Sequence, residues 1–499
     1  MKHLHELIQF HSKVSFSLKG GKQNPFEKKL KGLSLKLYSS IKQNKFETEE
    51  DALADLYNLK MKSSTKKFQM LKSRLISQLV NDTAQFDINK LSSDKRFKSI
   101  YEVYRYSFLA RSIEAAGSRG VSVQMAKKAV KLSRHYEFFD QAIIHSRILM
   151  HHYALEGDAK MFEYYAKQMS ESIKILDVEL QAETAYYRLV FRQIRFRTAN
   201  IELIDEAKQQ FLRLKEKLKK YHSFTSYVFY YRIGLAYYQL IRNYSKALLL
   251  CKKFENLIEK STHASERELS SEVSLIKLAC FRNLEKNKEG LKAAQTGSTL
   301  FREGGYNWFV FHEQYLLLAT HMSDFTLAWE IYKKVSFNAS FHLQPPVIRD
   351  YWRLIEAYLA LFSPAGREIN REEILRFLNE DTSYSADKKG FMTSLKIAQI
   401  FFMIEDREFN LAEGMIEALR LFVRRNFNTK NAERTILFCR MLKTISSYGF
   451  IENRARLFTK SNLAKLKASK SSAVENTHSE EIIPYEIMYE GMMKLLSRK

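Results

Sequence analysis

Hydrophobic and polar residues alternate along most of the chain with the period of an α-helix. From about residue 95 onward, amphipathic stretches of roughly 14 to 22 residues are separated by polar breaks of a few residues. Residues 101–117 are typical, with apolar side chains at helical spacing until Gly117. Because the breaks are short, neighbouring helices are expected to pack antiparallel. The pattern predicts an all-α protein.

A short motif recurs within this alternation: an aromatic residue, two variable residues and an alanine. It reads YSKA at 244–247, FTLA at 325–328 and FNLA at 409–412. Extending its register to every second helix gives positions about 42 residues apart, which predicts a repeat of helix pairs. These positions are Phe162, Ala207, Ala247, Ala293, Ala328, Glu372 and Ala412. A small side chain there would let two helix axes approach to about 8 to 10 Å.

The best copy of the repeat contains Tyr238, Tyr244, Ala247 and Cys251. With these residues the chain resembles the tetratricopeptide-like (TPR-like) superfamily of α-solenoids over about residues 120–467, although its repeat is longer than the usual one of about 34 residues. The resemblance implies a right-handed α-solenoid of antiparallel helix pairs with a concave surface. It implies no particular ligand.

Distinct regions flank the repeats. Residues 1–94 are basic and amphipathic, and we expect them to form a small helical N-terminal cap on the first repeat. The TPR-like array is expected over 95–467, followed by a polar linker over 468–482. A C-terminal amphipathic helix is expected over 483–499, where it either caps the stack or docks back into its groove.

Composition agrees with a nearly all-helical fold, because 16 Gly and 5 Pro leave few helix breakers in 499 residues. The three cysteines, Cys251, Cys280 and Cys439, lie far apart in apolar helical sequence, which predicts buried thiols in a reducing compartment. The first residues lack the apolar core of a signal peptide, and no window of about 18 residues is apolar and uncharged. We therefore expect a cytoplasmic protein without a membrane span.

The chain is strongly basic, with 81 Lys and Arg against 56 Asp and Glu and a net charge of +25. The excess is concentrated in residues 1–100 and absent from residues 301–400. A solvated lysine-rich surface explains such a charge without any ligand. Nucleic acid, an anionic membrane face or an acidic protein are the alternatives.

Motifs for catalysis or metal binding are not found. The sequence has no phosphate-binding loop and no nucleophile elbow. His5 and His11 do not have the spacing of a zinc-binding helix, and we expect both at surface positions. His145, His151 and His152 lack acidic partners at helical spacing. We expect no enzyme activity, no cofactor and no metal ion.

The most suggestive stretch for binding is YYRLVFRQIRFR at 186–197, where three arginines at i, i+4 and i+7 form a stripe. Guanidinium groups in such a stripe bind carboxylates or phosphates. With nearby tyrosines, the candidate partner-binding residues are Arg188, Arg192, Arg195, Tyr187, Tyr231 and Tyr238. The alternative is that the arginines pair with acids of the next helix, such as Glu202 or Glu206, and that the rings fill wedges between repeats.

These features favour a non-catalytic scaffold whose concave groove holds a peptide or helix of an acidic protein partner. The alternative is an RNA- or ribosome-associated solenoid that uses the positive charge at 1–100 and 185–220. The oligomeric state and the helix of each pair that lines the groove stay open.

Overall fold

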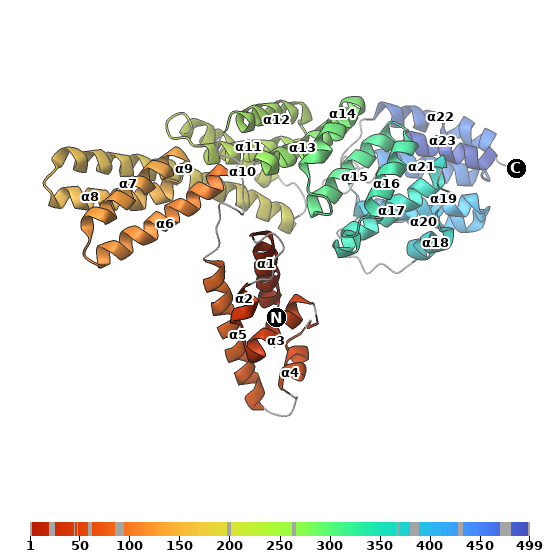
Figure 1. Cartoon of the computed structure of the whole chain (residues 1–499). Helices are drawn as coiled ribbons and strands as arrows, with labels where there is room; N and C mark the ends of the chain where they lie inside the picture. The colour runs from red at the N-terminus through yellow and green to blue at the C-terminus, as the bar shows by residue number, and fades with distance from the viewer. Residues whose placement is uncertain are drawn as a thin grey trace. The chain divides into compact units, whose positions relative to one another are not determined.

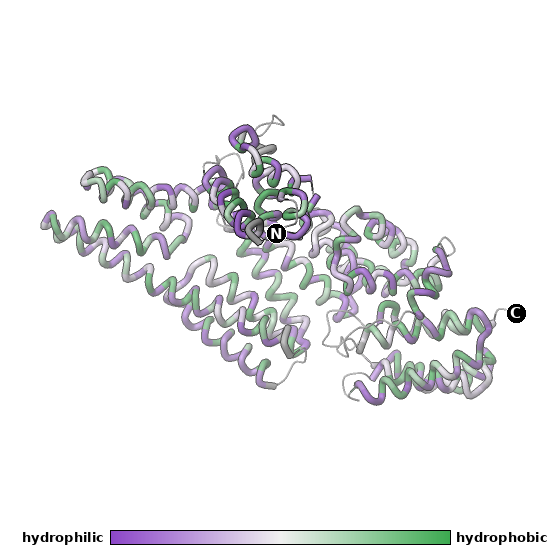
Figure 2. The backbone as a smooth tube through the Cα atoms, turned by 90° about the horizontal axis from the view of Figure 1, so that it is seen from below, coloured by the Kyte–Doolittle hydropathy of each residue, from purple (hydrophilic) through white to green (hydrophobic). Residues whose placement is uncertain are grey.

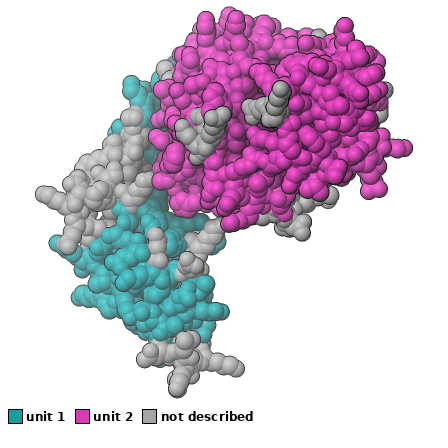
Figure 3. Space-filling view, turned by 90° about the vertical axis from the view of Figure 1, so that its right-hand side faces the viewer, with its two compact units in different colours: residues 1–173 teal, residues 174–499 magenta. Residues whose placement is uncertain are grey.

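The computed structural model describes residues 2–18, 25–43, 45–46, 48–57, 62–84, 94–196, 201–261, 266–364, 366, 369–379, 389–427, 433–469 and 481–497. Within these ranges the regular elements are helices and no strand occurs, so the all-α prediction is confirmed. The chain divides into two compact units, residues 1–173 and residues 174–499 (Figure 3).

Unit 1 begins with helices that share a small hydrophobic core. They are α1 (Lys2–Leu18), α2 (Pro25–Lys29), α3 (Gly32–Lys42), α4 (Glu49–Tyr57) and α5 (Lys62–Thr83). Leu4, Leu37, Phe68 and Leu75 are fully buried between α1, α3 and α5. This part is helical as expected, and its role as a cap on the first repeat stays a prediction. The surface position expected for His11 is wrong: the ring is buried, and its Nε2 lies 3.0 Å from Asp82 Oδ2.

The remaining helices of unit 1 follow one another through short turns. They are α6 (Lys95–Ala115), α7 (Arg119–His135), α8 (Phe139–Leu155) and the first part of α9 (Ala159–Phe196), which continues into unit 2. Helix α6 packs on α7, and α7 packs on α8. The imidazole of His145 is buried in α8, 2.6 Å from the hydroxyl of Ser107, and burial lowers its pKa to about 4.

Unit 2 is a succession of helices in which each one from α10 to α23 contacts the next (Figure 1). They are α10 (Ile201–Lys217), α11 (Phe224–Leu240), α12 (Tyr244–Glu259), α13 (Glu266–Asn283), α14 (Asn287–Gly297), α15 (Tyr306–His321), α16 (Phe325–Ser336), α17 (Pro346–Phe362), α18 (Arg371–Asn379), α19 (Lys389–Glu405), α20 (Phe409–Asn426), α21 (Glu433–Ser447), α22 (Glu452–Ala468) and α23 (Tyr485–Ser497). Two short 3₁₀ turns lie at Ser298–Leu300 and Phe341–Leu343. Hydrophobic and hydrophilic residues alternate along these helices (Figure 2), as the sequence pattern predicts.

A recurring turn joins many of the helices. In each turn a residue with positive φ stands two positions before the next helix, and the following backbone N–H donates to a carbonyl five residues back, as in a Schellman motif. The residues in this position are Gly117, Glu137, Gly157, Arg242, Glu285, Ser323 and Arg407. Before α22 both Gly449 and Phe450 have positive φ, and the N–H of Phe450 donates to the carbonyl of Ile445. Because most of these positive-φ residues are not glycine, the turn is not visible as a run of glycines in the sequence.

The small residues of the repeat are buried, with changes of register in α10, α14 and α18. Ala207, Ala247, Ala328 and Ala412 are fully buried, and the last three are the fourth residues of their helices, whereas Ala207 is the seventh of α10. In α14 the equivalent fourth residue is Gly290, not Ala293, and in α18 it is Ile374, not Glu372. A Cβ on Gly290 would lie 2.8 Å from Leu318 Cδ2, so a larger residue at this crossing would force the Leu318 side chain to move. Ala455 adds a further copy in α22.

The cysteines Cys251, Cys280 and Cys439 are free and buried, and burial raises the pKa of the Cys280 thiol to about 12. Within the described part of the chain, none of the helices combines the length and the hydrophobicity needed to cross a membrane.

Candidate peptide-binding surfaces

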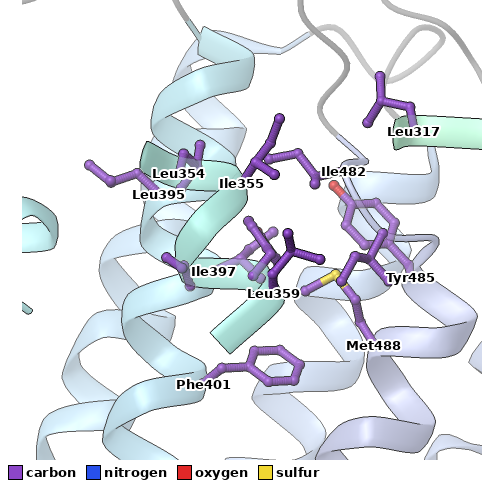
Figure 4. Close-up of a cluster of buried hydrophobic side chains, with 14 of the residues drawn as sticks. Leu317, Leu354, Ile355, Leu359, Leu395, Ile397, Phe401, Ile482, Tyr485 and Met488 are labelled. Carbon is purple, nitrogen blue, oxygen red and sulfur yellow. The ribbon is translucent and has the colours of Figure 1, made fainter. Parts of the chain in front are cut away.

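Residues 481–497, here called the C-terminal segment, lie against a large apolar surface of unit 2. Ile482, Tyr485 and Met488 face Ile355 and Leu359 of α17 (Figure 4). The buried residues of the segment are Ile482, Ile483, Tyr485, Met488, Tyr489, Met492, Met493, Leu495 and Leu496. Helix α23 contacts both α19 and α22. The last helix therefore packs on the array, with only Glu490, Lys494 and Ser497 exposed among its described residues. Whether it caps the stack or occupies its groove stays a prediction.

Arg434 of α21 fixes the charged part of this segment. Its Nε and Nη2 atoms donate to the two carboxylate oxygens of Glu481 at 2.7 and 2.9 Å. Its Nη1 and Nη2 atoms donate to Glu486 at 2.9 and 2.7 Å. Burial alone would lower the pKa of Arg434, but hydrogen bonds to the two carboxylates outweigh it and raise the pKa. Arg434 is 6% exposed, so its guanidinium makes these four charge-assisted hydrogen bonds largely out of contact with solvent.

The array itself orients the guanidinium group. Nη1 of Arg434 also donates to the carbonyl oxygens of Leu466 and Ser469 at 2.9 and 3.0 Å. These carbonyls lie at the end of α22, where a helix leaves its last carbonyls without helical partners. Both are supplied by the array and not by the C-terminal segment, so the helix end helps to hold the arginine in place for a carboxylate.

Hydroxyl groups and one ring complete the docking surface. The hydroxyl of Thr320 donates to the carbonyl of Ile482 at 2.7 Å, and the hydroxyl of Thr459 lies 2.8 Å from that of Tyr489. The ring of Tyr485 stacks on Phe438, with centroids 4.5 Å apart. We call the array residues that contact the segment the docking surface: Thr320 and His321 of α15, Ile355 and Leu359 of α17, Arg434, Thr435 and Phe438 of α21, and Thr459 of α22.

A second surface runs across α9, α11 and α13. Tyr186 and Tyr187 lie beside Phe229, at centroid distances of 5.8 and 6.1 Å. The guanidinium of Arg232 lies over the rings of Tyr186 and Phe229 and binds Glu272 of α13 in bidentate fashion, at 3.0 and 2.6 Å. We call these five residues the α9–α13 surface. Its arginine meets one carboxylate, and Tyr187 is 54% exposed.

The six residues proposed from the sequence lie in different surroundings. Tyr187 and Arg188 are exposed on α9. Arg192 pairs with Glu202 and Glu206 of α10, as the alternative interpretation of the stripe proposed. The side chain of Arg195 lies outside the described residues.

The two tyrosines of α11 pack between helices. Tyr231 stacks on Phe254 of α12 with centroids 5.0 Å apart. Tyr238 lies 5.9 Å from the ring of Phe211 in α10, and Lys246 approaches its ring. Both are half-buried, so these rings fill the space between neighbouring helices. Of the five candidate residues whose side chains the structure describes, Tyr187 and Arg188 are exposed.

The residues that sequence reasoning missed are Arg434, Glu481 and Glu486, together with Arg232 and Glu272. The amphipathic pattern of the last helix was the only available signal for the first group. Among the described residues, no three His, Cys, Asp or Glu side chains are grouped so that they could hold a metal ion.

No known protein-family model matches this chain, and the comparisons with curated proteins and with solved structures gave no significant match.

Proposed function

We propose that the protein is a non-catalytic scaffold that holds an acidic peptide or amphipathic helix of a partner protein on its helical array. One observation carries the proposal: the array already binds a segment of this chemistry, its own residues 481–497. A desolvated arginine takes two carboxylates, while aromatic and aliphatic side chains cover the apolar side of a helix.

The α9–α13 surface, with the neighbouring Arg188, is the proposed place for the partner. It has a similar chemistry, an arginine beside aromatic rings, and its Tyr187 is exposed together with the neighbouring Arg188. Tyrosine and arginine are the residue types that most often anchor protein interfaces. An acidic partner segment would place its carboxylates near Arg188 and its apolar side on Tyr187.

We further propose that the array is a right-handed TPR-like solenoid, in which the proposed binding surfaces belong to the concave side. The recurring Schellman turn and the buried small residues at the helix crossings support this proposal. A cytoplasmic location is proposed from the three free, buried thiols, which are typical of a reducing compartment.

Capture of partners from the native host with the full chain tests the proposed function. We expect wild type to retain a specific protein, and Tyr187→Ala/Arg188→Ala to lose most of it. Arg302→Ala/Tyr306→Ala removes the same two residue types from exposed positions elsewhere in unit 2 and should retain the protein.

The same experiment distinguishes nucleic acid from protein. Binding that neutralises several phosphates falls by about a thousandfold or more between 50 and 200 mM salt, whereas an apolar interface changes little. Recovery of RNA with that salt dependence, and no protein that depends on Tyr187 and Arg188, would replace the scaffold proposal by the RNA-binding alternative.

A further inference from the structure

The C-terminal segment follows the array after the longest connection between consecutive α-helices of unit 2. Residues 469–484 separate α23 from α22. Helix α23 nevertheless places most of its side chains at a buried interface, the arrangement of an amphipathic helix bound on a receptor surface.

The docking surface has the features of a prepared receptor site. The carbonyls of Leu466 and Ser469 orient Arg434, and the hydroxyls of Thr320 and Thr459 meet polar atoms of the segment. On the segment side, Met488, Met492 and Met493 are buried. Methionine side chains adapt to different surroundings, which suits an interface that can form with more than one sequence.

From this arrangement we infer that the docking surface is a binding site for a partner segment with two carboxylates five residues apart and an amphipathic helix, and that residues 481–497 occupy it as an internal ligand. The inference rests on the proposed scaffold function and deepens it by naming a second site and its ligand. The internal ligand supplies the pattern: Glu481 and Glu486 on Arg434, Ile482 and Tyr485 between them.

Chain connectivity explains why the internal ligand is bound. Ser469 and Glu481 both contact Arg434, so residues 470–480 join two points on the same guanidinium. A short tether of this kind gives an effective local concentration on the order of millimolar. An external segment with the same chemistry therefore binds only when it exceeds that concentration or when the internal carboxylates are weakened.

The first experiment weakens the internal ligand and leaves the docking surface unchanged. A fluorescein-labelled peptide with the sequence of residues 481–497 is titrated into the full chain and followed by fluorescence anisotropy. We expect Glu481→Gln/Glu486→Gln to bind it at least tenfold more tightly than wild type. Glu490→Gln is the matched control, because this half-exposed glutamate pairs only with the partly exposed Arg456 among the described residues, and it should behave as wild type.

Equal peptide affinities for wild type and the double variant, with unchanged circular dichroism, would overturn the inference and make α23 a fixed part of the fold. A second measurement uses the wild-type chain, in case the double variant does not fold. Excess unlabelled peptide should increase hydrogen exchange within residues 485–497 of the protein, because the external segment displaces the internal one. Unchanged exchange at saturating peptide would contradict the inference.

The outcome is separable from that of the proposed function. If the peptide displaces the internal segment but the host yields no protein partner, the site stands and the scaffold proposal fails. If a host protein depends on Tyr187 and Arg188 and is captured by wild type and by Glu481→Gln/Glu486→Gln alike, in the presence or absence of peptide, the scaffold proposal stands and the second site fails.

Discussion

The docking surface and the α9–α13 surface use similar side chains in different states. In the first, Arg434 meets two carboxylates and two carbonyls and is almost fully buried. In the second, Arg232 pairs with one carboxylate, that of Glu272, lies over two aromatic rings and stays partly exposed near the exposed Tyr187. The comparison links the burial of Arg434 to the acidic amphipathic segment that covers it. It also predicts that the two surfaces contribute very differently to stability.

The largest expected change in the free energy of unfolding comes from removing Arg434, the arginine of the docking surface. Arg434→Ala leaves Glu481 and Glu486 without their guanidinium partner, and breaking a buried ion pair on one side costs about 3 to 5 kcal/mol. We expect urea unfolding to show a loss of this size. Arg420→Ala, which removes an exposed i,i+3 pair with Glu417, should cost less than about 1 kcal/mol. Similar losses for both variants would show that the buried pair has no special role.

A matched pair of glycines tests how closely α23 packs. A Cβ on Gly491 would overlap the ring of Phe362, which is held between Phe325 and Phe401. A Cβ on Gly414 of α20 would have no other side chain or distant backbone atom within 4 Å. Both Gly→Ala changes gain up to about 1 kcal/mol of helix propensity, but only Gly491→Ala pays for overpacking, about 1 to 3 kcal/mol.

The unfolding free energies of the two alanine variants, measured in the same urea titration, should therefore differ by about that overpacking cost. If Gly491→Ala were as stable as Gly414→Ala, α23 would not be held against α17 as described.

Acid should lower the stability of the fold through His321 of the docking surface. Burial, with a smaller effect of Arg282, lowers the pKa of His321 from 6.5 to about 3, and its ring also faces Arg434 and the carbonyl of Glu481. Below about pH 6.5 the unfolded chain binds a proton that the folded chain does not, so stability falls as the pH decreases from 6.5 towards 3. Between pH 7 and pH 5 the expected loss from this group is about 1 to 2 kcal/mol.

Urea midpoints at the two pH values check this prediction in wild type and in His321→Gln, whose amide can still donate to Glu481. The acid-induced loss should be smaller in the variant. Because His312 is retained in both chains, and burial also lowers its pKa to about 4, the difference isolates His321. An identical loss in both chains would exclude His321 as the cause.

Sequence periodicity could predict the helices, the repeat and an amphipathic last helix, because these depend on residues close together in the chain. The register in α14 could not be predicted, since the stretch GLKAA offers small residues at Gly290, Ala293 and Ala294, and the helix start at Asn287 decides between them. The pairing of Arg192 with Glu202 and Glu206 was an available alternative, because its partners lie in the adjacent helix.

The sequence contains no pattern that predicts the ion pairs of Arg434. Its two carboxylate partners are 47 and 52 residues further along the chain, and only tertiary packing brings them together. A buried ion pair of this separation has no local periodicity, and the arginine itself has the sequence context of an ordinary helix position.

The smallest expected effect lies on the open α9–α13 surface. Arg232 and Glu272 form a bidentate pair, but both side chains are partly exposed, so solvent screens their attraction. A double-mutant cycle with Arg232→Ala and Glu272→Ala should give a coupling energy of about 0.5 to 1 kcal/mol in urea unfolding. A coupling as large as about 3 kcal/mol would mean that this pair is as desolvated as Arg434 with its glutamates. The α9–α13 surface would then be desolvated without any bound segment. This result would contradict its proposed role as an open binding site for a partner.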